Sequence, residues 1–406
     1  MAQSHPIADW LERHWVSPAY AGSLLTGIAL SFFGAATNTL AGWLYVISGL
    51  ILAMLVISAI LPVRSLRGIK IHRYPIEPVS VGDPLIVELE ISNHTNQPKT
   101  LLQLQDLIPQ KLGAPAQTVL ERIPARDRAL WSYRYPTERR GVYRWHEVQL
   151  RTATPLGLFW CRRSRQVPAV AIVYPTVLPL SRCPLIDAMG RDENPQFSSN
   201  HRSHMATEGL TRALRPYRWG DPTRLIHWRS SARYGTLRVR ELEIFTGGQE
   251  IIICLDSAAS WDHAQFEQAV IAAASLYFYA LRQAMLVKLW TAGSGLLHSE
   301  TTLATNGGRT SWQSSQAALE TLASTYAGED LVTEPPTDVP LLWLTTNAAS
   351  LEALPTGSRW LLWPGASQAA TMLDLSPSSV GHPGLVIQPT ETLLTQLQVN
   401  PDKVLV

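Results

Sequence analysis

Glu250-Ile251-Ile252-Ile253-Cys254-Leu255-Asp256 is an unbroken apolar run bounded by acids. A run of this length is typical of a central parallel strand that is buried on both faces. From Asp262 the apolar residues recur at helical spacing, and shorter apolar runs alternate with helical segments as far as residue 397. The alternation predicts a doubly wound α/β domain over residues 245–406.

The composition is unusually low in charge. Only 16% of the 406 residues are charged, compared with about 25% in an average soluble protein. Such a chain is either partly embedded in a membrane or rich in buried residues, and is not mainly disordered. The cysteines are few and far apart, so we expect buried, inert thiols in a reducing compartment rather than a disulfide framework: Cys161, Cys183 and Cys254.

Residues 1–74 predict a transmembrane helical hairpin. The 50 residues from His14 to Val63 contain no Asp, Glu, Lys or Arg. They hold two apolar spans, residues 18–36 and 40–61, each near the ~20 residues that cross a bilayer. Thr37-Asn38-Thr39 is the expected turn, and small residues, among them Gly27 and Gly34, are expected where the helices touch.

Basic residues flank the spans, whereas the turn between them is uncharged. They are Arg13, Arg64, Arg67, Lys70 and Arg73. The positive-inside rule therefore places the soluble parts in the cytoplasm, with the hairpin in the cytoplasmic, or inner, membrane. Three tryptophans are candidates for interfacial anchors, although ordinary packing explains them as well: Trp10, Trp15 and Trp43.

Residues 75–180 predict an antiparallel β-sandwich. In the run Leu85–Ile91 every second residue is apolar, which is the pattern of a half-buried strand. Similar runs follow at 100–107, 129–135, 142–150 and 170–174, separated by turn residues. Domains of this kind usually bind or act as spacers.

Residues 181–244 comprise a loop, expected over 187–209, and an Arg-rich segment. Nine Arg and no Lys lie between residues 202 and 240, for a net charge of +7, and aromatic residues are interleaved with them. Guanidinium groups bind carboxylates or phosphates and stack on aromatic rings. We favour pairing with the acidic residues 245–406, net −9, over nucleic-acid binding, which stays open.

The Arg-rich segment resembles the signature of the family called domain of unknown function 58. The residues that carry the resemblance are Arg215, Tyr217, Gly220, Asp221, Arg224, Trp228, Ser231, Arg233 and Glu241. Shorter motifs agree with it: Arg140-Gly141-Val142-Tyr143, Pro155-Leu156-Gly157-Leu158-Phe159 and Val173-Tyr174-Pro175. The resemblance implies that residues 245–406 have a fold like von Willebrand factor type A, and that the partner is a MoxR-type AAA+ ATPase.

The implied fold binds a divalent metal through an Asp-x-Ser-x-Ser loop after its first strand. Here Asp256 and Ser260 match the outer positions, but Ala258 replaces the middle hydroxyl and Thr345-Thr346-Asn347 offers no acid. Hard cations need several oxygen ligands. We therefore expect a degenerate site that holds Mg²⁺ weakly unless a partner contributes a carboxylate.

No enzyme motif is found in the sequence, so we do not expect catalysis. The resemblance implies a membrane-anchored cytoplasmic adaptor or scaffold that acts with the ATPase in protein-complex assembly or envelope maintenance. The alternative is an Arg-rich binder of anionic ligands: nucleic acid, a phosphorylated partner or lipid headgroups.

Overall fold

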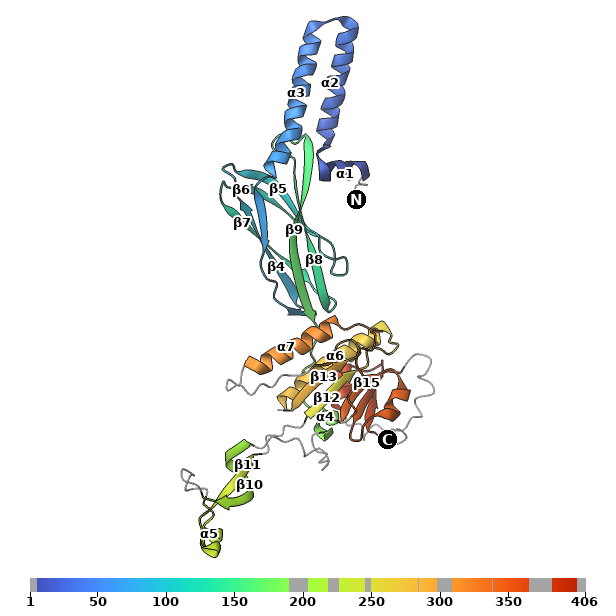
Figure 1. Ribbon diagram of the computed structural model, residues 1–406. Helices are drawn as coiled ribbons and strands as arrows, with labels where there is room; N and C mark the ends of the chain where they lie inside the picture. The colour runs from blue at the N-terminus through green and yellow to red at the C-terminus, as the bar shows by residue number, and fades with distance from the viewer. Residues whose placement is uncertain are drawn as a thin grey trace. The chain divides into compact units, whose positions relative to one another are not determined.

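The computed structural model describes eight ranges of the chain, separated by gaps. They are residues 6–189, 204–217, 226–244, 250–283, 285–297, 309–337, 339–364 and 382–399. The chain divides into two units, Met1–Pro175 and Thr176–Val406 (Figure 1).

Two long apolar helices lie side by side in the first unit, α2 (Tyr20–Thr39) and α3 (Gly42–Ser65) (Figure 1). Both are long and apolar enough to be candidate membrane spans. The expected turn at 37–39 is wrong, because the chain reverses at Leu40, which has a left-handed φ of 53°. The Thr37 hydroxyl donates to the Gly34 carbonyl, so this polar side chain is satisfied within the helix and does not require a turn.

Small residues line the contact between α2 and α3, but not those that we expected. Gly27 and Gly34 are exposed, whereas Ala29 and Ala36 are fully buried. The Ser48 hydroxyl donates to the Ala29 carbonyl at 2.9 Å across the contact. The spacing of small residues alone does not decide which stripe of a helix faces its neighbour.

Two antiparallel sheets form a sandwich after α3, which confirms the predicted antiparallel strands. One sheet has the order β1-β9-β8-β5-β6, with β3 parallel to β9, and the other has the order β2-β4-β7. The strands are β1 (Ser17–Pro18), β2 (Ile69–Arg73), β3 (Val79–Ser80), β4 (Pro84–Asn93), β5 (Lys99–Asp106), β6 (Ala116–Ile123), β7 (Arg128–Pro136), β8 (Gly141–Thr152) and β9 (Phe159–Tyr174).

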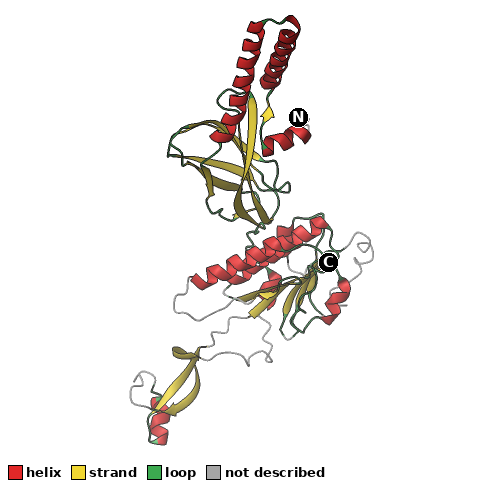
Figure 2. Cartoon of the chain, turned by 45° about the horizontal axis from the view of Figure 1, so that its top comes forward, coloured by secondary structure: helices red, strands yellow, loops and turns green. Residues whose placement is uncertain are grey.

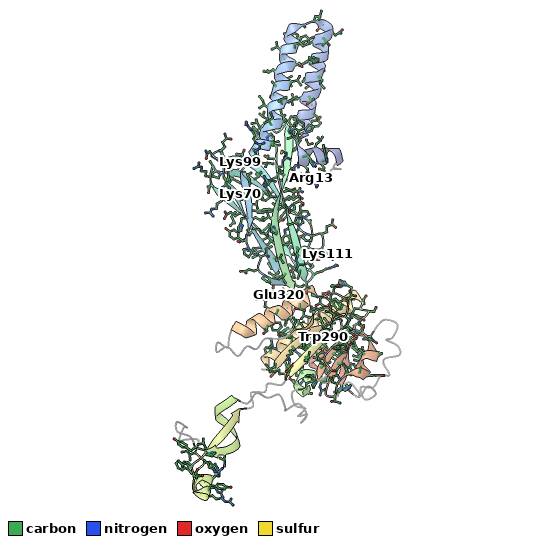
Figure 3. All side chains as sticks on the ribbon, in the orientation of Figure 1. Arg13, Lys70, Lys99, Lys111, Trp290 and Glu320 are labelled. Carbon is green, nitrogen blue, oxygen red and sulfur yellow. The ribbon has the colours of Figure 1, made fainter. Side chains whose placement is uncertain are left out.

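A short helix, α1 (Pro6–His14), precedes β1 and lies beside the first sheet (Figure 2). Figure 3 places Arg13, Lys70 and Lys99 at the end of the sandwich next to α2 and α3, and Lys111 toward the other end.

A buried carboxylate connects the two sheets of the sandwich. Asp106 of β5 accepts two hydrogen bonds from the guanidinium of Arg73 in β2, at 2.5 and 3.0 Å. The Tyr133 hydroxyl donates to Asp106 at 2.8 Å and the Trp145 indole N–H at 2.9 Å. Burial, with the nearby Asp106 charge, holds the pKa of Tyr133 well above its usual value, so this hydroxyl stays a donor.

Removing this carboxylate is expected to destabilise the sandwich. Asp106→Ala leaves the Arg73 charge buried and unpaired, which costs about 3–5 kcal/mol of unfolding free energy, whereas Tyr133→Phe removes one hydrogen bond and costs about 1 kcal/mol. Hydrogen exchange of peptides from β4 and β7, followed by mass spectrometry, measures the change in the sandwich alone. The exposed ion pair of Arg128 with Glu90 is the control, since Arg128→Met is expected to cost less than about 1 kcal/mol.

The second unit contains a six-stranded mixed sheet of order β14-β13-β12-β15-β16-β17. All neighbouring pairs are parallel except β13 with β14 at the edge. The strands are β12 (Glu250–Leu255), β13 (Leu286–Thr291), β14 (Gly295–Leu297), β15 (Leu341–Thr345), β16 (Arg359–Leu362) and β17 (Gly384–Val386). The predicted central strand is therefore confirmed, with β13 and β15 on either side of it.

Helices cover the sheet unequally. Four α-helices in the described ranges contribute to one core cluster on one face of this sheet, which includes Phe266 of α6 and Leu322 of α7. They are α4 (Pro184–Met189), α6 (His263–Arg282), α7 (Arg309–Ser324) and α9 (Leu393–Gln398). The other face packs Trp290 and Trp343 against the 3-10 helix η3 (Ala348–Ala353). A doubly wound domain has α-helices on both faces of its sheet. In the described ranges the α-helices cover one face only, and indole rings and η3 cover the other.

β10 (His204–Pro216) and β11 (Arg238–Ile244) form an antiparallel pair, and the short helix α5 (Trp228–Tyr234) lies at the end of this pair, in the connection between the strands (Figure 1). The expected loop over residues 187–209 is wrong at both ends, because α4 extends to Met189 and β10 begins at His204. The sequence of this strand shows no regular alternation of apolar and polar residues that would have predicted it, and its backbone pairs with β11.

Candidate functional site

The carboxyl ends of β12 and β15 define the candidate site. Between these strands the order of the sheet reverses, with β13 following β12 on one side and β15 on the other. Ligands of open α/β sheets bind at such a switch point, beyond the strand ends. Asp256 follows β12 directly, and Thr345 is the last residue of β15.

Asp256 is half-buried at this point and held from both sides. Its Oδ2 accepts a hydrogen bond from the Thr345 hydroxyl at 2.7 Å, and its carbonyl accepts one from the Trp261 indole at 2.6 Å. Burial raises the pKa of the Asp256 carboxyl, although the Thr345 hydroxyl and the Ala259 N–H oppose the shift. The ionised side chain therefore lies where its charge is poorly solvated.

A second carboxylate, Glu329, fixes the loops around Asp256. The Ser257 hydroxyl donates to Glu329 at 2.7 Å, and the backbone N–H groups of Gly293 and Tyr326 donate to it at 3.2 Å each. In turn the Ser257 hydroxyl accepts from the Ala292 N–H at 3.0 Å. This buried group ties the segments after β12, β13 and α7 to one another.

The segment that Glu329 holds exposes large apolar side chains. Tyr326, Leu331 and Val332 are all exposed, and the Val332 N–H donates to the Ala292 carbonyl after β13. These three side chains, which we call the strand-end patch, therefore lie on a loop beside the carboxyl ends of β12 and β13.

The donors near Asp256 do not fit a Mg²⁺ site that the chain closes by itself. The Ser257 hydroxyl is already used by Glu329 and Ala292, and Ala258 has no oxygen in its side chain. Ser260 is exposed, and its carbonyl accepts from Thr346. The described residues contain no group of three His, Cys, Asp or Glu placed to bind a metal. Binding of Mg²⁺ by Asp256 and Ser260 therefore stays a prediction, and it requires a carboxylate from a partner.

Part of the predicted Arg-rich signature is structural where it is described. The buried Ser231 hydroxyl donates to the His227 carbonyl at 3.0 Å and accepts from the Arg238 N–H at 2.9 Å, which joins α5 to β11. His227 caps the helix by accepting from the Ser230 N–H. The Tyr217 N–H donates to the Leu237 carbonyl.

The other described signature residues face water. Trp228 and Arg233 are exposed, and the guanidinium of Arg238 lies 4.5 Å from the centre of the exposed Tyr234 ring. Gly220, Asp221 and Arg224 lie outside the described residues, as do the side chains of Arg215 and Glu241.

The thiols are buried, as expected. Burial raises the pKa of Cys183 to about 11, and the pKa values of Cys161 and Cys254 are raised for the same reason. A high pKa lowers the fraction of nucleophilic thiolate at neutral pH.

Sequence reasoning missed Glu329 and the strand-end patch. The partners of Glu329 lie up to 72 residues away, so no local pattern marks it. Leu331 and Val332 carried a signal, because they are an apolar pair inside a polar, proline-rich segment.

A comparison with family models finds the family described as protein of unknown function DUF58, which matches residues 213–329. The match runs from the signature segment to Glu329 and confirms the family resemblance over these residues. No curated protein matches the chain.

Similar solved structures include a CARDB domain from Pyrococcus furiosus. It is 9% identical over 25% of this chain and 94% of that one, with a TM-score of 0.19. A β-glucosidase from Listeria innocua in complex with gluconolactone is 13% identical over 24% of this chain and 16% of that one, with a TM-score of 0.15. TM-scores this low do not establish a shared fold.

Glu329→Ala is expected to loosen the strand-end patch. The Ser257, Gly293 and Tyr326 donors lose their shared acceptor, and buried unsatisfied donors cost about 1–3 kcal/mol each. Hydrogen exchange of peptides covering 326–333 measures the effect, with the exposed neighbour Asp330→Ala as control. Equal protection in the two variants would contradict this role for Glu329.

Asp256→Asn is expected to raise the melting temperature at pH 8 and to change it less toward pH 4. A carboxyl whose pKa is raised by folding favours the folded state only while it is protonated, so the folded protein loses this contribution as pH rises through the pKa. Asparagine can still accept from Thr345 and does not ionise. Thermal unfolding of both proteins across this pH range measures the difference, and a lower melting temperature for the variant at pH 8 would show that the charge is structural.

Proposed function

We propose that the chain is a membrane-anchored adaptor whose strand-end patch binds a protein partner, a MoxR-type AAA+ ATPase. The observation that carries the proposal is the exposure of Tyr326, Leu331 and Val332 on a segment that buried Glu329 holds in place. Rigid, exposed aromatic and aliphatic groups are the usual anchors of protein interfaces, because little conformational entropy is lost on binding.

Charge around the patch favours a partner with basic residues at the rim of its binding surface. Exposed Asp330 and Glu334 lie on the same segment as the patch, and residues 245–406 carry a net charge of −9. Complementary charges speed association and select among partners. Asp256 adds a carboxylate whose burial is unfavourable for stability, which is typical of a group kept for binding.

The candidate spans α2 and α3 supply the membrane anchor in this proposal. Many large apolar side chains of both helices are exposed, among them Leu30, Val46 and Leu50. Such surfaces are stable in lipid and unfavourable in water. The basic residues at the sandwich end of the helices favour the cytoplasmic face of the inner membrane, where an ATPase would have access to its nucleotide.

Replacing an apolar anchor by a charge is expected to abolish docking. We expect Leu331→Asp to weaken binding of the purified ATPase to the full chain in detergent by at least about tenfold, or about 1.4 kcal/mol. Leu286→Asp is the matched control, because Leu286 is an exposed leucine at the amino end of β13.

Pull-down from detergent extract identifies the partner. We expect the wild-type chain to retain an AAA+ ATPase and Leu331→Asp to lose it. Repeating the experiment with a chelator shows whether a metal at Asp256 takes part. Recovery of no AAA+ ATPase under either condition would count against the adaptor role.

A second candidate is an Arg-rich binder of anionic ligands. The observation that favours it is the exposure of Trp228, Arg229, Arg233 and Tyr234 together on α5, where Arg229 and Arg233 form no ion pair among the described residues. Guanidinium groups beside exposed rings can clamp phosphates and stack on bases.

Salt dependence distinguishes the two candidates. If α5 binds nucleic acid, the affinity for RNA or DNA falls steeply with salt, and Arg233→Gln reduces the slope by about one unit. No measurable binding at low salt would eliminate the second candidate and leave the adaptor role intact.

A further inference from the structure

The helix α1 has the reverse of the burial expected for a helix in water. Glu12 is 4% exposed. Trp10, on the same helix, is 59% exposed, and Trp15, the residue that follows the helix, is 67% exposed. A soluble amphipathic helix buries its aromatic residues and exposes its acids. Exposed indole rings of this kind are typical of a face that meets lipid or protein rather than water.

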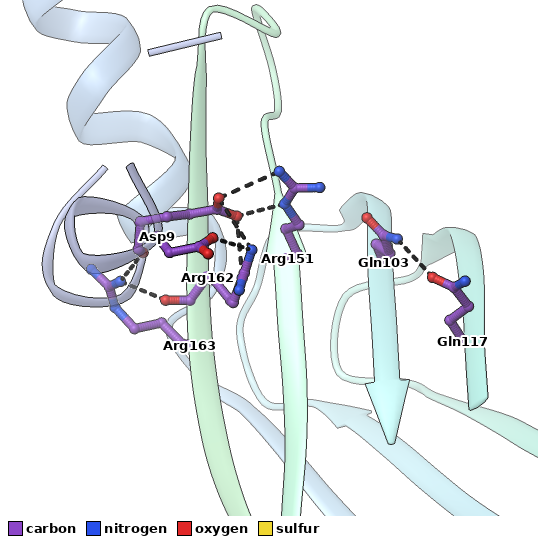
Figure 4. Close-up of polar contacts among 7 residues, drawn as sticks. Asp9, Gln103, Gln117, Arg151, Arg162 and Arg163 are labelled. Atoms are coloured by element: carbon purple, nitrogen blue, oxygen red, sulfur yellow. Dashed lines mark hydrogen bonds and ion pairs between the residues drawn. The ribbon is translucent and has the colours of Figure 1, made fainter. Parts of the chain in front are cut away.

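An arginine clamp holds the acidic face of α1 against the sandwich. Glu12 accepts hydrogen bonds from Arg151 of β8 and Arg162 of β9, and Arg162 also reaches Asp9 at 3.5 Å (Figure 4). Such charge-assisted bonds to a buried carboxylate fix which face of the helix turns inward.

A third arginine fixes the carboxyl end of α1. The guanidinium of Arg163, which Figure 4 shows beside α1, donates to the carbonyls of Glu12, Arg13 and Trp15 at 2.9–3.1 Å. These carbonyls lack partners within a helix that ends here, so Arg163 serves as its cap. The clamp thus presents Trp10 and Trp15 outward as part of a rigid sandwich.

The exposed face of α1 is continuous with the candidate membrane spans. β1 leads from α1 to α2, whose first residue Tyr20 is 85% exposed. The Ala19 N–H donates to the Leu158 carbonyl, and Gly22 lies so close to that carbonyl that a Cβ would be 2.1 Å from its oxygen. The root of α2 is therefore fixed to the same β8–β9 turn that exposes Leu156.

We propose that α1 is an interfacial helix that rests on the lipid headgroups with Trp10 and Trp15 immersed, and that the arginine clamp thereby sets the tilt of the sandwich against the bilayer. Trp prefers the membrane interface because its ring is apolar and its N–H needs a polar partner. Exposed Arg13 on the same helix suits anionic headgroups. The proposal rests on membrane insertion of α2 and α3.

The depth of single fluorescent labels tests the proposal. The label, a nitrobenzoxadiazole thiol reagent, is attached to Trp10→Cys, Trp15→Cys, Val46→Cys or Val119→Cys of the full chain in vesicles of phosphatidylcholine and phosphatidylglycerol. Val46 lies in α3, and Val119 is an exposed valine of β6. The native thiols are buried, and the unsubstituted chain is the control for their labelling.

Two quenchers with nitroxides at different depths report where each label lies. We expect a headgroup nitroxide to quench labels at positions 10 and 15 about twofold more than a nitroxide deep in the acyl chains. The label at position 46 is expected to be quenched more by the deep nitroxide, and the label at position 119 by neither quencher.

The outcomes separate this proposal from the membrane anchor itself. Deep quenching at position 46 with labels at 10 and 15 open to aqueous iodide would overturn the interfacial helix and leave the anchor standing. If labels at positions 10 and 15 are shielded from both iodide and the lipid quenchers, the exposed face of α1 contacts a protein instead of lipid. This result would also overturn the proposal. No quenching at position 46 would overturn the anchor and, with it, this inference.

The clamp is tested separately with the label at position 10. We expect Arg163→Met to release the end of α1, so that quenching at position 10 changes while position 46 keeps its depth. Arg122→Met, a change in exposed β6, is the control. Unchanged quenching in Arg163→Met would remove the clamp from the proposal.

Discussion

A carboxylate withdrawn from water must receive its hydrogen bonds from the protein, and this constraint organises three places in the chain. Glu12 joins α1 to β8 and β9, Asp106 joins the two sheets of the sandwich, and Glu329 joins the segments around the carboxyl ends of β12 and β13. At each place the donors come from segments far apart in the sequence. A buried charge without its donors is strongly unfavourable, so each carboxylate keeps the segments around it in one arrangement.

Two of these buried carboxylates, Glu12 and Glu329, keep apolar side chains exposed at the surface. Glu12 keeps Trp10 and Trp15 outward beside the candidate membrane spans, while Glu329 supports the apolar strand-end patch. In both cases an ionic group lies inside and apolar groups lie outside, which is the reverse of ordinary folding. The exposed apolar groups then remain available to lipid or to a protein partner, because the buried donors prevent them from collapsing inward.

Local pattern predicted much of the fold. The alternation of apolar and polar residues at 85–91 and the apolar run at 250–256 predicted β4 and β12 correctly. In each strand the polarity of the side chains matches the burial of the face on which they lie. β6 and β10 were missed, because neither stretch of sequence alternates regularly between apolar and polar residues. The site was predicted only in part: Asp256 follows from its place after a buried strand, whereas Glu329 has no local mark.

The sequence by itself determined the helices long enough to span a membrane, the antiparallel strands and the parallel central strand. These depend on the periodicity of neighbouring side chains, which is a local property. Only the tertiary structure decided that Glu12 meets Arg162, 150 residues away, and that Glu329 meets Ser257, 72 residues away. Such pairs form only when packing brings distant donors to one carboxylate. The local spacing of residues along the chain therefore cannot predict them.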